Sequence, residues 1–130
     1  MARLGSVRSR RNRLVLVMSN DAVAAALVGA LVETLGYEVH FSRSSEDPLV
    51  TLGRERPDVA FLDGGDQLLI SDALLGHAAM RNIRVVVFGE RAVVERIRTL
   101  AHAHRLHTLI VPASLDEVND VLGAAFAEPR

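Results

Sequence analysis

Residues 57–63 have the sequence Pro-Asp-Val-Ala-Phe-Leu-Asp, and this stretch decides the class of fold. Four consecutive apolar residues, Val59–Leu62, follow the Pro-Asp pair and end at the acidic Asp63. A short apolar run without polar alternation is typical of a strand buried on both faces, as strands of parallel sheets are. The stretch therefore predicts a buried strand, the third of five along the chain.

Similar runs recur on both sides of this stretch and alternate with segments of helical periodicity. The other predicted strands are Leu14–Met18, Glu38–Phe41, Ile83–Phe88 and Thr108–Val111. The predicted helices are Asp21–Leu35, one capped by Ser45, Ser71–Met80, Arg91–Leu106 and one from Ser114 to about Phe126. Glu46, Asp47 and Pro48 suit the first turn of the second helix, and Ser114 with Glu117 forms a capping box.

The spacing of apolar residues predicts which face each helix presents to the core. In the first helix the stripe has a spacing of four, with Gly36 placed to end the helix. Its members are Val23, Leu27, Leu31 and Leu35. In the helix before the last strand, the inward residues are Val94, Ile97 and Ala101. In the last helix they come from Val118, Val121, Leu122 and Ala125, of which we expect two to be buried.

Five alternating strands and helices joined by short loops predict an α/β, doubly wound parallel sheet of flavodoxin-like type, with strand order 2-1-3-4-5. In such a sheet, ligands bind outside the carboxyl ends of the strands. The candidate functional residues are therefore those that follow strands one, three, four and five. They are Ser19, Asn20, Asp21, Asp63, Gly89, Glu90, Val111 and Pro112.

Composition agrees with one cytoplasmic globular domain of 130 residues, 49% hydrophobic and 24% charged. No apolar run has the length of a membrane span, and no cysteine is present for a disulfide or a thiolate metal site. All 15 basic residues are arginine, so chemistry that needs a lysine amine is excluded. Five arginines lie in the first thirteen residues, which leaves 10 against 16 acidic residues in the remainder. We therefore divide the chain into a basic flexible arm, 1–12, and a domain, 13–127.

Several stretches together resemble the receiver domain of bacterial response regulators, and the resemblance covers residues 13–127. The stretches are RLVLVMSND (13–21), LVETLGYEV (31–39), RPDVAFLD (56–63) and Val111-Pro112. The resemblance implies a phosphoacceptor at Asp63, which ends the third strand. In that family an acidic pair after the first strand binds Mg²⁺, a Ser or Thr ends the fourth strand, and a Lys precedes the proline after the fifth.

The sequence departs from the family at most of these positions. The acidic pair falls on Ser19 and Asn20, with Asp21 one residue later. The Ser/Thr position falls on Gly89, and the Lys position falls on Val111. Gly64-Gly65-Asp66-Gln67 replaces the proline-containing loop that usually follows the phosphoacceptor. The resemblance therefore implies the fold more strongly than the phosphorylation site.

The charges at the replaced positions determine whether Asp63 can take part in phosphoryl transfer. Phosphoryl transfer relies on positioned cations, because negative charge spreads over the oxygens of the transferred group. Asp21, Asp63 and Asn20 could hold Mg²⁺, but two carboxylates bind it more weakly than three. Val111 supplies no ammonium group, and Gly89 supplies no hydroxyl. We therefore expect a degenerate receiver domain, not an enzyme and without a required cofactor, that signals by binding a protein independently of phosphorylation.

Two other functions stay open at this point. One is a working receiver whose Asp63 takes a phosphoryl group from a kinase or a small donor. The other is a regulatory domain that binds an anion or a nucleotide, although residues 19–26 (SNDAVAAA) lack the glycine-rich turn of dinucleotide sites.

Individual candidates have structural alternatives. Asp21 suits a helix first turn, and Ser19 or Asn20 suits a helix N-cap, whatever the function. His104 and His107 are three apart and would share a helix face, but His102 points elsewhere, so a zinc site is the less favoured interpretation.

The sequence also proposes surfaces for partners. In the family, the fourth helix, fifth strand and fifth helix make dimer or partner contacts. The fourth helix here offers charged residues for such a face: Arg91, Glu95, Arg96 and Arg98. The arm carries Arg3, Arg8, Arg10 and Arg11, and Arg13 directly follows it. It could bind phosphates, an acidic protein surface or, weakly, nucleic acid, since it has no aromatic residue for base stacking; equally, it could be a flexible leader.

Overall fold

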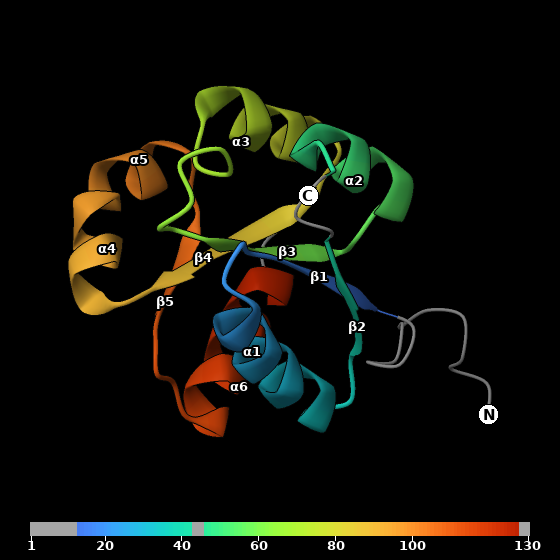
Figure 1. The fold of residues 1–130 in the computed structure, drawn as a ribbon, viewed down its shortest axis with the longest axis vertical. Coiled ribbons are helices and arrows are strands. Elements are labelled where there is room, and N and C mark those ends of the chain that lie inside the picture. The colour runs from blue at the N-terminus through green and yellow to red at the C-terminus, as the bar shows by residue number, and fades with distance from the viewer. Residues whose placement is uncertain (1–12, 43–45, 128–130) are drawn as a thin grey trace.

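The computed structural model describes residues 13–42 and 46–127, which form a parallel sheet between two layers of helices (Figure 1). Its strand order is β2-β1-β3-β4-β5, and all four strand pairs are parallel. The predicted fold class and strand order are thus confirmed. The strands are β1 (Leu14–Met18), β2 (Glu38–Phe41), β3 (Val59–Asp63), β4 (Arg84–Gly89) and β5 (His107–Ile110).

The strands are apolar throughout because each face of the sheet has its own core. Val15 and Val17 of β1 point to one face and Leu16 and Met18 to the other, and all four are at most 1% exposed. β3 and β4 alternate in the same way, with Phe61 and Phe88 on the first face. The continuous apolar runs of the sequence are therefore two interleaved core faces.

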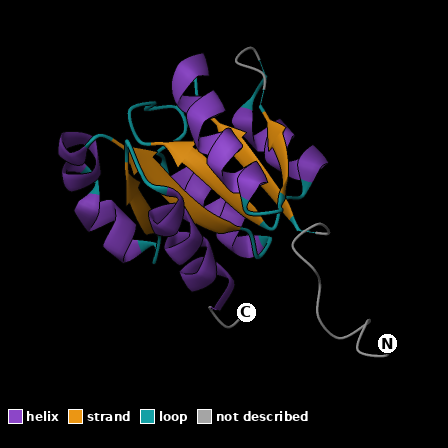
Figure 2. Ribbon diagram, turned by 90° about the horizontal axis from the view of Figure 1, so that it is seen from below, coloured by secondary structure: helices purple, strands orange, loops and turns teal. Residues whose placement is uncertain are grey.

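Helices cover both faces, as Figure 2 shows. α1 and α6 pack on the face of Phe61 and Phe88, and α2, α3, α4 and α5 lie on the other. Their bounds are α1 (Ala22–Thr34), α2 (Pro48–Glu55), α3 (Asp72–Met80), α4 (Arg91–Arg96), α5 (Arg98–Ala103) and α6 (Leu115–Ala127). Among the described residues, no helix combines the length and the apolar character that crossing a bilayer requires.

Several helix ends follow from local chemistry. Gly36 has a φ of 98° after α1, as predicted. The capping box of α6 is confirmed, because Ser114 N donates to Glu117 Oε1 (2.8 Å) and Glu117 N donates to Ser114 Oγ (3.1 Å). α2 is capped by Asp47, whose carboxylate accepts from Leu49 N (2.9 Å), with Pro48 in the first turn. The predicted cap Ser45 and the arm 1–12 lie outside the described residues.

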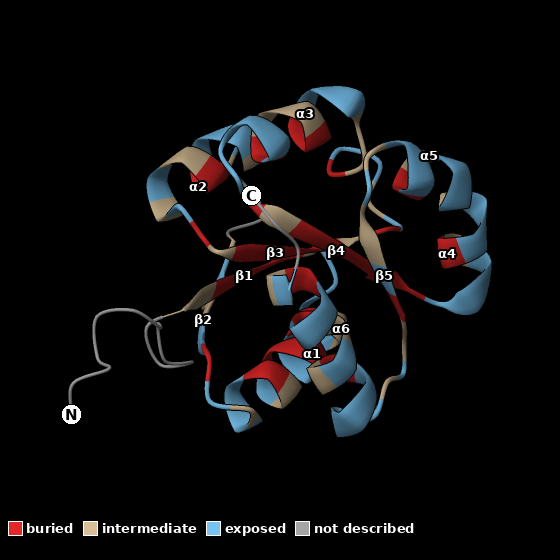
Figure 3. Ribbon diagram, turned by 180° about the vertical axis from the view of Figure 1, so that it is seen from behind, coloured by how far each residue is buried: buried red, intermediate tan, exposed pale blue. Residues whose placement is uncertain are grey.

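Three predictions about the helices are wrong. α1 has a buried and an exposed face (Figure 3). Its buried residues are Ala25, Val28, Gly29 and Val32, whereas Val23 and Leu27 of the predicted stripe are 70% and 62% exposed. The predicted helix 91–106 is two short helices that meet at Ile97, although Val94 and Ala101 are buried as expected. α6 buries three residues instead of two: Val118, Leu122 and Ala125.

Candidate functional site

The carboxyl ends of the strands place Asp63 at the centre of the candidate site. Asp63 ends β3 between β1 and β4, and both of its carboxylate oxygens accept hydrogen bonds. Ser19 Oγ, which follows β1, donates to Oδ2 at 2.7 Å, and Gly65 N in the next loop donates to Oδ1 at 2.8 Å. Within the described residues, Asp63 has neutral donors and no ion-pair partner.

Asp21 is the N-cap of α1, which corrects the prediction that Ser19 or Asn20 caps this helix. Its Oδ1 accepts hydrogen bonds from Val23 N (3.0 Å) and Ala24 N (3.1 Å). Ser19 Oγ instead accepts from Asp21 N at 2.9 Å. The hydroxyl of Ser19 therefore links the start of α1 to Asp63, and the carboxylate of Asp21 accepts hydrogen bonds from the first turn of α1.

Asn20 turns to a different carboxylate. Its Nδ2 donates to Asp66 Oδ2 at 2.7 Å, across the loop that follows β3. The three groups predicted to hold Mg²⁺, Asp21, Asp63 and Asn20, thus each have another hydrogen-bond partner. In the part of the chain that the structure describes, no three His, Asp or Glu side chains are placed to hold a metal ion together. The magnesium set stays a prediction.

Gly89, at the end of β4, lies against an apolar side chain. A Cβ built at Gly89 would lie 2.8 Å from Cγ1 and 3.1 Å from Cβ of Val93 in α4. The same Val93 Cγ1 would lie 2.9 Å from a Cβ at Gly64, whose N–H donates to Phe88 O (2.8 Å). Val93 therefore fills the space beside Asp63 into which a side chain at position 89 would project.

Val111 contributes a backbone contact and apolar packing. Its N–H donates to Gly89 O at 2.9 Å, and its side chain packs against the core formed with α1 and α6. The Val111–Pro112 peptide bond is cis. The position that the resemblance assigns to a lysine is thus apolar and faces the core.

The three histidines do not share a helix face. His102 is in α5, His104 caps the end of that helix, and His107 begins β5, so the predicted helical spacing of His104 and His107 is wrong. His104 Nε2 lies 2.8 Å from Asp72 Oδ1 at the start of α3. This pair joins the end of α5 to the start of α3.

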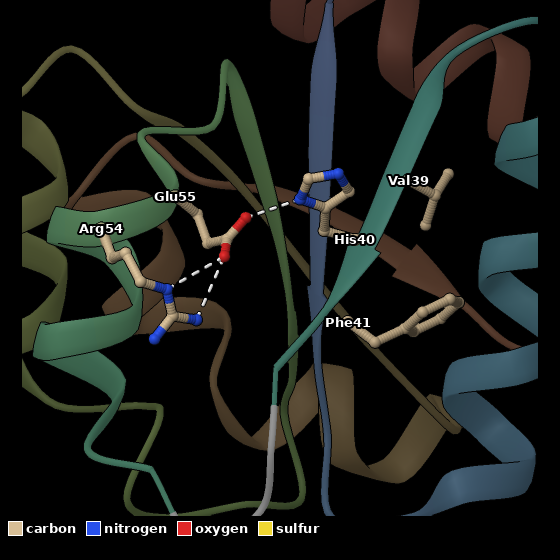
Figure 4. A pocket seen from close by; sticks show the side chains of 5 residues that line it. All are labelled: Val39, His40, Phe41, Arg54 and Glu55. Carbon is tan, nitrogen blue, oxygen red and sulfur yellow. Dashed lines mark hydrogen bonds and ion pairs between the residues drawn. The ribbon is translucent and has the colours of Figure 1, made fainter.

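A charged network at the edge strand was not predicted from the sequence (Figure 4). His40 in β2 contacts carboxylates through both ring nitrogens. Nδ1 lies 2.6 Å from Glu55 Oε1, the contact drawn in Figure 4. Nε2 lies 2.9 Å from Glu38 Oε2. Arg54 Nη2 donates to Glu55 Oε2 at 3.0 Å, and Arg54 Nη1 pairs with Glu46. The signal in the sequence was the Glu38-Val39-His40 spacing, since residues two apart on a strand share a face.

The network perturbs the pKa values of its members, His40 and Glu55 among them. The hydrogen bond that the His40 imidazole makes to the Glu55 carboxylate, aided by Glu38, raises the pKa of His40 against the opposing effect of burial. The hydrogen bond from His40, aided by Arg54, lowers the pKa of Glu55. Together these groups favour a protonated His40 that ties β2 to α2.

Comparisons with known proteins bear on the fold. No protein-family model and no curated protein sequence matches the chain. Solved structures do match it. The chemotaxis response regulator CheY4 of Vibrio cholerae matches at 15% identity and a TM-score of 0.66, covering 87% of this chain and 98% of that one. A response regulator receiver domain from Clostridium thermocellum matches at 16% identity and a TM-score of 0.70, covering 87% and 93%.

A third match comes from a protein named for a different process. The structure described as a pilus assembly-related protein from Burkholderia pseudomallei is 20% identical, with a TM-score of 0.73, and covers 93% of this chain and 94% of that one. Identities at this level establish a shared fold. With its strand order, its helices on both faces and an aspartate at the end of β3, this chain has the fold of the response regulator receiver domains.

Proposed function

We propose that this chain is a degenerate receiver domain that acts in bacterial signal transduction by binding another protein, without phosphorylation of Asp63. The observation that carries the proposal is the position of Val93. Its side chain occupies the space beside Gly89 and Gly64 that a hydroxyl-bearing residue at position 89 would need. A hydroxyl-bearing residue at position 89 would therefore overlap Val93, and Gly89 itself offers a phosphoryl group on Asp63 no hydroxyl donor.

The charges around Asp63 support the same proposal. The sequence contains no lysine, and Val111 faces the core where an ammonium group would be required. The carboxylate of Asp21 accepts from its own helix. A transferred phosphoryl group carries negative charge, and neither Val111 nor Asp21 supplies a positive charge to offset it.

Beryllofluoride with Mg²⁺, observed by fluorine NMR, tests the proposal directly. We expect no bound-fluoride signal from this chain under conditions in which a phosphorylatable receiver domain gives one. A bound signal that disappears in Asp63→Asn would overturn the proposal and favour the working receiver, with Asp63 as phosphoacceptor and Asp21 near the metal.

A restoring variant gives the converse test. The substitutions Ser19→Asp, Gly89→Thr, Val93→Ala and Val111→Lys together supply a carboxylate, a hydroxyl with room for it, and an ammonium group. We expect this variant to form the beryllofluoride adduct. The matched variant that keeps Val93 should form it more weakly, because a threonine side chain at position 89 would still overlap Val93. Equal binding by both variants would remove Val93 from the explanation.

The face formed by α4, α5, β5 and α6 is our proposed contact for a protein partner or a second copy. Arg91, Glu95, Arg96 and Arg98 are all exposed on this face. Such a polar contact should weaken with salt. Sedimentation of the unmodified protein at low and high salt tests the dimer: a monomer at both would restrict this face to a different partner.

A further inference from the structure

A groove between α2 and α3 is not used by the proposed function. It has a volume of about 500 Å³ and is lined in part by Glu46, Asp47, Leu49, Leu68, Ala73 and Leu74, which we call the α2–α3 groove. A smaller hollow of about 60 Å³ adjoins it and shares Glu46 and Leu68 with it. Since Ser19 also lines the smaller hollow, the two together extend from the end of β1 to the start of α3.

The groove exposes apolar side chains that the core does not need. Leu68 is 76% exposed and Leu49 is 39% exposed. Leu68 lies in the loop after β3, where its N–H donates to Asp66 Oδ1 at 3.0 Å, so its backbone is held in place. An exposed leucine on the wall of a groove offers binding energy to an apolar side chain that enters it.

Among the described residues, the ionisable side chains that line the two hollows are all acidic: Glu46, Asp47 and Asp66. Glu46 pairs with Arg54 in the last turn of α2. Asp66 accepts from two neutral groups, Asn20 Nδ2 and Leu68 N. A segment that carries both positive charge and apolar side chains therefore suits this groove.

The chain itself contains such a segment. The first twelve residues carry Arg3, Arg8, Arg10 and Arg11, with Leu4 and Val7 between them. Twelve extended residues span up to about 40 Å. β1, which joins the arm to the hollow beside Ser19, has five residues and spans about 17 Å. The arm is therefore long enough to reach the groove of its own chain.

We propose that residues 3–12 bind in the α2–α3 groove of the same chain, with arginines beside the acidic groups and Leu4 or Val7 against Leu68. The covalent link favours this arrangement over a second copy, because it fixes a high local concentration of the arm. The inference goes beyond the proposed function, and the result of the beryllofluoride experiment at Asp63 does not test it.

A spin label tests this inference, because the chain has no cysteine of its own. Ser6→Cys in the full-length chain places a single label in the arm. At about 0.1 M salt we expect the amide signals of Leu49, Leu68 and Leu74 to lose more than half of their intensity in ¹H–¹⁵N spectra. At about 1 M salt the signals should recover, since the Debye length falls from about 10 Å to about 3 Å.

Two matched variants locate the contact. Leu68→Arg replaces an exposed leucine of the groove with a positive charge, and we expect it to abolish the broadening. Met80→Arg makes a comparable change at the end of α3, at a residue that is 87% exposed and does not line the groove, and should leave the broadening intact. Both positions are exposed, so both variants should fold.

Other patterns of broadening would overturn the inference. A mixture of spin-labelled ¹⁴N chain with ¹⁵N chain that carries no spin label should show no broadening. Broadening in that mixture would assign the groove to the arm of a second copy. Broadening centred on the acidic start of α6, or none on any described residue, would show that the arm does not bind in the groove. Unchanged broadening in Leu68→Arg would have the same meaning.

Discussion

At the scale of single residues, the contact between Gly89 and Val93 distinguishes this chain most clearly from a phosphorylatable receiver. The glycine at the end of β4 leaves room for the β-branched side chain of Val93 in α4. The two residues must therefore be considered together. Because the closest approach of a Cβ at position 89 would be to Val93 Cγ1, the two positions should be energetically coupled.

We therefore predict a non-additive pair of substitutions. Gly89→Ser should destabilise the protein by about 1–3 kcal/mol, as overpacking of a filled space does. In a Val93→Ala background the same substitution should cost less, because the obstructing methyl groups are gone. Urea denaturation of the wild type, the two single variants and the double variant measures the coupling. Additive free energies of unfolding would contradict the packing described for Val93.

At the scale of elements, the His40 network connects β2 to α2 through charge. Because the pKa of His40 is raised in the folded chain, the protonated imidazole stabilises the fold. This stabilisation is complete below the unfolded pKa, near the ordinary value of 6.5, and is lost as the pH rises through the higher folded pKa.

The resulting prediction concerns the pH dependence of stability. Between about pH 6 and about pH 8.5 the wild type should lose more stability than His40→Gln, by less than about 1 kcal/mol because the imidazole is 43% exposed and solvent screens it. Urea denaturation of both proteins at the two pH values measures the difference. A parallel decline in both proteins would show that His40 does not titrate with folding.

The two faces of α1 provide a second prediction at this scale. Val32 is fully buried and Leu27 is 62% exposed, although the sequence periodicity favours Leu27 as a core residue. Val32→Ala should therefore destabilise the protein by about 2 kcal/mol. Leu27→Ala, which removes a larger side chain, should change stability by less than about 0.5 kcal/mol. Thermal or urea denaturation checks both, and the reverse order would restore the face predicted from the sequence.

The elements also show what the sequence could and could not predict. The strands were predictable because a strand buried on both faces must be apolar at every position, as Leu14–Met18 and Val59–Leu62 are. The buried face of α1 was not, because alanine, valine and leucine occur all round this helix and Glu33 is its one charged residue. The buried face contacts residues from distant parts of the chain, and one example is Phe41 of β2, whose ring would overlap a Cβ at Gly29.

The candidate site was predictable in position but not in its contacts. The carboxyl ends of the strands identified Ser19, Asp63 and Gly89 as neighbours. The hydrogen bond from Ser19 to Asp63 joins residues 44 apart, and Val93 lies on a helix whose periodicity marks Val94 as the inward residue. Such contacts depend on how side chains from separate elements meet, which local spacing does not encode.

At the scale of the whole molecule, the receiver fold is retained while the groups around Asp63 are largely neutral. A ligand that binds the native state alone raises the free energy of unfolding by an amount that grows with the logarithm of the ratio of its concentration to its Kd. The stability of the intact protein therefore reports whether a metal site remains.

We predict that Mg²⁺ at about ten millimolar leaves the melting temperature unchanged relative to the same ionic strength of sodium chloride. The reason is that Asp21 Oδ1 caps α1 and the Asn20 amide donates to Asp66, so a cation beside Asp63 would compete with both contacts. Differential scanning calorimetry makes the comparison, with Asp63→Asn as a control. A rise in the wild type that the control lacks would establish the metal site that the sequence suggests.

The outer strands of the sheet have a consequence for behaviour at high concentration. β2 and β5 each have only four residues, and β2 carries Glu38 and His40 among its four. A strand added from another molecule would have to align with this charged, short edge, which disfavours open-ended sheet extension. Concentrated solutions should therefore resist fibril growth through β2, even though Phe41, the last residue of this strand, is half exposed.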